Sequence, residues 1–171
     1  MGNKKNIIKK IRTALISVSD KSNLNNLLKA LKKNKIKLIS SGGTYKAIKK
    51  LKFSCIEVSD FSESPEVLDG RVKTLHPKIH GALLGRRGID DAVMEEHEIK
   101  AIDLVVVNLY PFEEAVSKKN CTFENAIENI DIGGPTMVRA AAKNFKNVTI
   151  CQLQPNNDFF WIRNLVLERK K

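Results

Sequence analysis

The chain has 171 residues, of which 42% are apolar and 29% charged, proportions typical of one globular domain. No apolar run approaches the ~20 residues that a membrane span needs. Residues 1–12 form a basic arm without the apolar segment of a secretory signal. We therefore expect a cytoplasmic protein with no membrane partner.

The net charge of +11 suggests nucleic-acid binding, but its distribution argues against that function. Residues 1–52 hold 15 of the 30 Lys and Arg residues and a single acid, Asp20. The excess is therefore local, mostly lysine, and lacks the interleaved aromatic residues of single-strand binders. We interpret it as a solvated face that helps to draw an anionic substrate, and we expect no nucleic-acid partner.

Strand and helix patterns alternate along the chain. Short apolar runs predict strands over residues 13–18, 37–40, 55–58, 104–109 and 148–151. Leucines at i, i+3, i+4 and i+7 predict a helix over 24–31, with Ser22 as its cap. Further helices are expected over residues 44–50, 90–98, 122–130, 135–144 and 158–167, and Pro135 is expected at the first position of its helix. The alternation predicts an α/β fold with three layers, a mainly parallel sheet with helices on both faces.

Polar runs follow the carboxyl ends of three of these strands. They are Ser17–Lys21, Ser41–Thr44 and Asn108–Phe112. Ligands of open α/β sheets bind outside the carboxyl ends of the strands, so the three runs are expected on one rim. Hydroxyls, free backbone N–H groups and Lys21 favour an anion cradle, although ordinary turns can have the same composition. Neither a Walker loop nor a dinucleotide fingerprint is present, so ATP and NAD are not implied.

The run Gly70–Pro77 combines a guanidinium, an ammonium, a hydroxyl and an imidazole. Its composition suits an anionic, planar ligand better than a core. Pro77 is expected to forbid a helix and to bias His76 to an extended conformation. The HxxxH spacing of His76 and His80 is therefore not interpreted as a metal site, and His76 is interpreted as a structural residue. The widely spaced Cys55, Cys121 and Cys151 indicate reduced thiols.

Six runs, in this order, closely resemble the N-terminal inosine monophosphate (IMP) cyclohydrolase domain of the bifunctional purine-biosynthesis enzyme. They are Ser17–Lys21, Ser41–Thr44, Gly70–Pro77, Asn108–Phe112, Asp131–Gly134 and Ala140–Asn144. The resemblance extends from about Thr13 to Val148 and implies a methylglyoxal-synthase-like fold. In this family a second domain is an aminoimidazole carboxamide ribonucleotide (AICAR) formyltransferase.

The resemblance implies that the chain closes the ring of formyl-AICAR, with loss of water, in the last step of de novo purine biosynthesis. The expected binding partner, formyl-AICAR, is a small purine nucleotide intermediate. The cyclohydrolase step uses no metal and no cofactor, because 10-formyltetrahydrofolate serves only the formyltransferase domain. The family is also homodimeric, so a homodimer is expected here.

The resemblance also implies residue roles. Lys143 is the leading acid/base, paired with Asp131, and Tyr110 assists. Lys73 and Lys143 are both suitable cations for stabilising the oxyanion. The general base stays open between Asp131 and a substrate-assisted route. The implied substrate-binding residues are Ser17, Ser19, Asp20, Lys21, Ser41, Gly42, Gly43, Thr44, Arg71, Val72, Thr74, Asn108, Ile132 and Gly133. Taken singly, Asp131 could be a turn aspartate, Lys143 an exposed helix lysine and Tyr110 a boundary aromatic.

The chain departs from the family pattern at three places. It has Glu63-Ser64 where the family usually has Gly-Phe, and Phe145 where the family usually has histidine after Lys-Asn. The family's cyclohydrolase domain continues somewhat beyond residue 171. We therefore expect residues 1–171 to be one cyclohydrolase-like domain with a shortened end and no formyltransferase domain. The apolar set at 159–167 is expected to pack on the sheet or to mediate self-association.

A second function is a non-catalytic phosphate- or nucleotide-binding regulatory domain of the same fold. The allosteric domain of carbamoyl-phosphate synthetase is similar in this respect. Such domains share the phosphate cradle but lack the combination of Lys73, Tyr110, Asp131 and Lys143. Presence of all four favours the enzyme.

Overall fold

A computed structural model describes residues 10–109 and 111–152 of the protein. Its centre is a five-stranded sheet with the strand order β3-β2-β1-β4-β5, in which every strand pairs in parallel with its neighbours. The strands are β1 Thr13–Val18, β2 Lys37–Ser40, β3 Ile56–Glu57, β4 Leu104–Asn108 and β5 Thr149–Gln152. The predicted α/β class is therefore confirmed.

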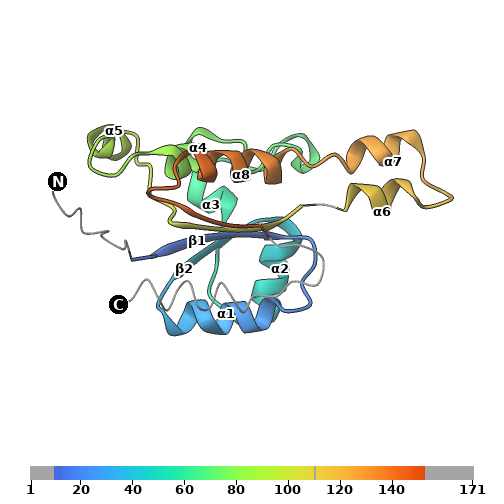
Figure 1. The fold of residues 1–171 in the computed structure, drawn as a ribbon, viewed down its shortest axis with the longest axis horizontal. Helices are drawn as coiled ribbons and strands as arrows, with labels where there is room; N and C mark the ends of the chain where they lie inside the picture. Colours follow the sequence, from blue (N-terminus) through green and yellow to red (C-terminus); the bar gives the residue numbers. More distant parts are fainter. Residues whose placement is uncertain (1–9, 110, 153–171) are drawn as a thin grey trace, which may run out of the picture.

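Helices cover both faces of this sheet (Figure 1). They are α1 Leu24–Lys33, α2 Gly42–Lys50, α3 Val58–Ser62, α4 Pro77–Leu84, α5 Asp91–Glu96, α6 Phe112–Val116, α7 Phe123–Glu128 and α8 Gly133–Lys143, with a short 3₁₀ helix at Leu68–Gly70. The helices α1 and α2 lie on one face, and α3, α4 and α8 on the other. The pair α6 and α7 extends beyond the end of the sheet.

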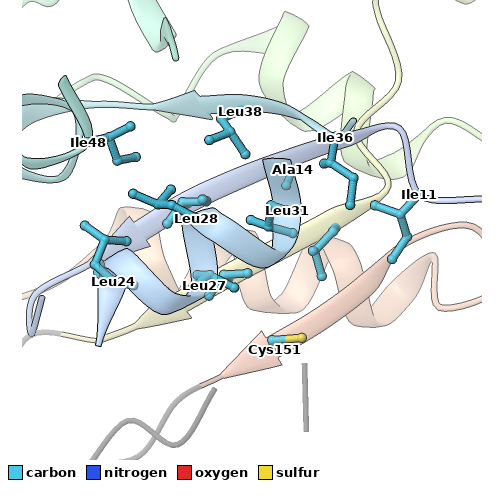
Figure 2. Close-up of a cluster of buried hydrophobic side chains, with 14 residues drawn as sticks. Ile11, Ala14, Leu24, Leu27, Leu28, Leu31, Ile36, Leu38, Ile48 and Cys151 are labelled. Carbon is cyan, nitrogen blue, oxygen red and sulfur yellow. The ribbon is translucent and has the colours of Figure 1, made fainter. Parts of the chain in front are cut away.

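Each face has its own apolar core. Figure 2 shows α1 laid against the sheet, with Leu24, Leu27, Leu28 and Leu31 turned toward the strands. These four leucines are at most 2% exposed, as their helical spacing predicts. On the opposite face Met137 and Ala141 of α8 pack with Ile79 and Leu83 of α4 and with alternate residues of β4. Burial on both faces explains why β4 is apolar at consecutive positions.

The predicted strands are confirmed, with ends that differ by a residue or two. Ser22 does not cap α1, because its amide and hydroxyl both donate to Asp20 and the helix begins two residues later. The helix predicted at 135–144 begins earlier, at Gly133, so Pro135 is its third residue and not its first. The helix expected at 158–167 lies outside the described residues.

Pro77 occupies a helical position that the sequence prediction did not give it. His76 is extended, with φ −136° and ψ 142°, as predicted. Pro77, however, does not forbid a helix; it begins α4, and the imidazole of His76 accepts from the Lys78 amide N–H. Proline is favoured at a first helical position because that residue has no intrahelical N–H bond to lose. In the described part of the chain no helix is long and apolar enough to span a membrane.

His80 gives the fold a pH dependence. Its Nε2 is buried and has no hydrogen-bond partner among the described residues, and desolvation lowers the His80 pKa. Below the ordinary pKa the unfolded chain therefore binds a proton that the folded chain resists, so stability falls with falling pH. We expect the free energy of unfolding, measured with urea, to decrease between pH 7.5 and 5.5, and His80→Leu to flatten that dependence. An unchanged slope in the variant would contradict this account of His80.

Candidate ligand-binding site

The site is built on the junction between β1 and β4, at the carboxyl edge of the sheet. Val18 pairs with Asn108 in the parallel register, so the residues that follow them emerge side by side. The amide N–H of Ser19 donates to Asn108 Oδ1, and the Ser19 hydroxyl lies 3.1 Å from the same oxygen and 3.2 Å from the carbonyl oxygen of Leu109. The two predicted runs therefore meet, and Asn108 has a structural partner in Ser19.

Thr44 fixes the first turn of α2 to the same edge. The Val18 amide N–H donates to Thr44 Oγ1 over 3.1 Å, and the hydroxyl donates back to the Val18 carbonyl over 2.9 Å. Because both polar groups of Val18 bind one side chain, the Ser41–Thr44 turn cannot move independently of β1. The first turn of α2, with N–H groups that lack intrahelical partners, is thus held beside the end of β1.

Two lysines approach this helix end. A Cβ built on Gly42 would lie 3.3 Å from Lys73 Nζ, and one on Gly43 would lie 3.9 Å from Lys21 Nζ. Lys21 Nζ also donates to the Ser19 carbonyl over 2.9 Å. The positive end of the helix dipole and two ammonium groups therefore converge, which is an arrangement that favours an anion.

The start of α8 closes the rim on the other side. Asp131 Oδ1 accepts from the Gly134 amide N–H over 2.8 Å. A Cβ on Gly134 would lie 2.6 Å from both Asp131 Oδ2 and Leu109 Cδ2, so the helix start sits against the residue that follows β4. A Cβ on Gly133 would lie 2.7 Å from Oγ1 of the buried Thr74. The glycines are needed here for close approach and not for unusual backbone angles.

These contacts form a closed circuit around the carboxyl edge. It runs from Ser19 to Asn108 and Leu109, on to the first turn of α8, across to Thr74 and Lys73, and back through the first turn of α2. The first turns of α2 and α8 therefore both belong to this circuit. The ammonium groups of Lys21 and Lys73 lie on the α2 side, and two glycines and Asp131 lie on the α8 side.

A small pocket lies on this rim beyond the ends of β2 and β3. It is lined by Ser41, Glu57, Val58, Ser59, Ser64, Pro65, Glu66 and Lys73. Most of these residues are absent from the predicted set, because nothing in their sequence separates them from ordinary loop residues. Only Glu66 could have been suspected from the sequence, because it lies in the loop at residues 63–66 that was compared with the cyclohydrolase family. Its carboxylate forms an ion pair with Lys73, at 2.8 Å.

Lys143 is the main exception among the predicted residues. It is the last residue of α8, whereas Asp131 precedes the first, so the length of the helix separates them by roughly 15 Å. The two side chains cannot reach each other within one chain, and the predicted Asp131–Lys143 ion pair is wrong. Lys143 lies exposed at the opposite edge of the sheet, next to the turn that leads into β5.

Other predicted residues near the rim have partners or positions of their own. Arg71 is exposed and forms an ion pair with Glu128 of α7 at 2.8 Å. Asp20 accepts from the Ser22 backbone and hydroxyl, and these two bonds lower the Asp20 pKa. Val72 forms a bridge with Val67, Ile132 is exposed and Ser17 is half-buried within β1. Tyr110 is outside the described residues, so its predicted role is untested.

Among the described residues no three His, Cys, Asp or Glu side chains gather closely enough to hold a metal ion. His76 and His80 are one helical turn apart at the start of α4, where the His76 imidazole is engaged with the helix backbone. The site on the rim thus consists of ammonium groups, hydroxyls, backbone N–H groups and carboxylates.

The fold and site define a parallel α/β domain with a polar rim at its carboxyl edge. Residues 23–136 match the family model described as "MGS-like domain". The chain therefore belongs to the MGS-like domain family. It is also similar to a solved structure entitled "Crystal structure of ForH", with 32% sequence identity and a TM-score of 0.79, covering 92% of this chain and 79% of that chain.

Two glycine substitutions test the closed rim. Gly133→Ala is expected to lower the melting temperature, because its Cβ would press on Thr74 Oγ1 at 2.7 Å. Gly43→Ala is the matched control, since its Cβ would meet only the flexible end of Lys21 at 3.9 Å. Alanine in a helix there should be neutral or stabilising by up to about 1 kcal/mol. Equal melting temperatures for the two variants would contradict the close approach of α8 to Thr74.

Proposed function

We propose that this protein is an IMP cyclohydrolase, which closes the ring of formyl-AICAR to give IMP. The observation that carries the proposal is the convergence of Ser19, Thr44, Lys73 and Asp131 on one rim of an MGS-like domain. These residues lie far apart in the sequence and come from four of the motifs that resemble the cyclohydrolase domain. In the proposed arrangement the first turn of α2 binds the phosphate, and Asp131 at the start of α8 supplies a carboxylate.

The proposed pose follows the charge of the rim. The substrate phosphate binds the first turn of α2, where Lys21 adds charge, and the ring bearing the formyl and carboxamide groups extends toward α8. Thr74 and Gly133 line that side through a contact too close for a side chain at position 133. Lys73 lies between the two ends, so its ammonium can contact either the phosphate or the formyl oxygen.

The proposed reaction needs few groups because both reacting ends belong to one molecule. The carboxamide nitrogen attacks the formyl carbon, a C–N bond forms, and the formyl oxygen gains charge that Lys73 stabilises. Asp131 accepts a proton from the carboxamide nitrogen and returns it to the formyl oxygen, which gives a carbinol. The carbinol oxygen then takes up the proton of the formamide nitrogen and leaves as water, so that a C=N bond completes the ring. Holding the two ends in a reactive geometry supplies much of the acceleration. The scheme uses no metal and no cofactor from this domain.

Lys143 has no place in this scheme within one chain. The second candidate function is therefore a non-catalytic nucleotide-binding domain. Such a domain needs only the α2 side of the rim, which would bind the phosphate. Turnover separates the two candidates. We further propose a homodimer working in the cytoplasm, which light scattering and localisation would test.

The test is conversion of formyl-AICAR to IMP, followed by absorbance. We expect the wild-type chain to be active and Lys73→Ala to reduce turnover by roughly 10²–10³ through loss of oxyanion stabilisation. The matched variant Lys143→Ala removes the same charge at the far end of α8, and its loss should be at least about tenfold smaller.

If the wild-type chain binds IMP but does not convert formyl-AICAR, the protein is a non-catalytic nucleotide-binding domain and not a cyclohydrolase. A larger loss in Lys143→Ala than in Lys73→Ala would contradict the proposed arrangement of the site.

A further inference from the structure

The loop that carries Lys73 has an unusual construction. Val67 and Val72 form an isolated antiparallel bridge, which places the residues just outside it, Glu66 and Lys73, opposite each other. Within the bridge the chain turns through Leu68 and Asp69, whose φ angles are 55° and 52°. Non-glycine residues rarely adopt this region, so the surrounding structure must hold the turn in place.

Gly70 makes room for the ion pair. Its φ is 85°, and a Cβ there would overlap Glu66 Oε1 and Lys73 Cε. The two side chains therefore cross directly over the glycine backbone, where no other residue would leave space. The Lys73 side chain is half-buried, at 31% exposed, whereas the Glu66 side chain is exposed, at 43%, and both line the pocket on the rim.

The charge around Lys73 explains why a carboxylate is needed there. Its ammonium lies against Gly42, the first residue of α2, where the helix dipole is positive, and Lys21 approaches the next residue. An ammonium is repelled from such a place unless an anion accompanies it. Glu66 is the carboxylate that forms an ion pair with Lys73, at 2.8 Å.

We propose that Glu66 is a positioning residue, whose carboxylate holds the Lys73 ammonium against the first turn of α2 and so prepares the rim for an anionic ligand. The inference rests on the proposed function for its ligand class, a phosphate monoester. It adds a role for Glu66 that acts through Lys73 and not through contact with the reacting atoms.

The experiment is a double-mutant cycle with inorganic phosphate as the probe, titrated by ³¹P NMR. Glu66→Gln preserves the shape of the side chain and removes its charge. We expect it to weaken phosphate binding roughly five- to tenfold, as for a charge-assisted contact. In a Lys73→Met background the same substitution should change affinity less than about twofold, because its effect passes through the ammonium.

Glu63→Gln is the matched control. Glu63 is in the same loop and carries the same charge, but it pairs with Lys78 outside the pocket. Its removal should leave phosphate affinity within about twofold of the wild type, so a general loss of negative charge would be recognised. Melting temperatures of all variants are measured in parallel, to separate positioning from unfolding.

Three results would overturn the inference: phosphate that does not bind the wild type, affinity that Glu66→Gln leaves unchanged or raises, or an equal loss in the Lys73→Met background. The formyl-AICAR assay reports separately on the proposed function. If Glu66→Gln weakens phosphate binding only when Lys73 is present, and the wild type shows no turnover, then the positioning role of Glu66 is supported and the cyclohydrolase function is rejected. If the wild type converts formyl-AICAR but the effects of Glu66→Gln and Lys73→Met are independent, then the cyclohydrolase function is supported and the positioning role of Glu66 is rejected.

Discussion

The parallel pairing of β1 with β4 is the constraint on which the site depends. It sets Val18 opposite Asn108, so the chain leaves both strands at the same edge and Ser19 reaches Asn108 and Leu109. Strand order reverses direction at this pair, with β2 and β3 on one side and β5 on the other. Such a switch point is where open parallel sheets leave a crevice for ligands. The first turns of α2 and α8 lie at this same edge, where Thr44 binds Val18 and Gly134 approaches Leu109.

Positive charge is concentrated at this edge of the sheet. Lys21 and Lys73 approach the first turn of α2, and Glu66 offsets part of their repulsion while no ligand is bound. On the opposite side Asp131 holds the start of α8 through the Gly134 amide. A ligand with a phosphate at one end and a polar ring at the other matches this asymmetry. The lysine-rich face of α1 and α2 adds a long-range field of the same sign.

Much of the fold could be predicted from sequence, because its signals are local. The apolar run of β4 and the leucines of α1 each specify one element, and the polar runs after the strands correctly indicated the rim. Pro77 and Pro135 were misplaced, since proline is compatible with several positions in a first helical turn. The pairing of Lys143 with Asp131 came from the family motif, although the helix predicted over 135–144 already set the two residues at opposite ends, as the length of α8 does in the structure. Glu66 was missed because its role arises from a loop that only the folded chain defines.

We propose that a nucleoside monophosphate lies across this edge, between the first turns of α2 and α8. The most direct measurement is a crystal structure of the protein with IMP. The account predicts the phosphate against Gly42–Thr44, within reach of Lys21 or Lys73, and the base beside Thr74 and Gly133. A phosphate bound at the α8 side, or IMP bound away from the carboxyl edge of the sheet, would contradict it.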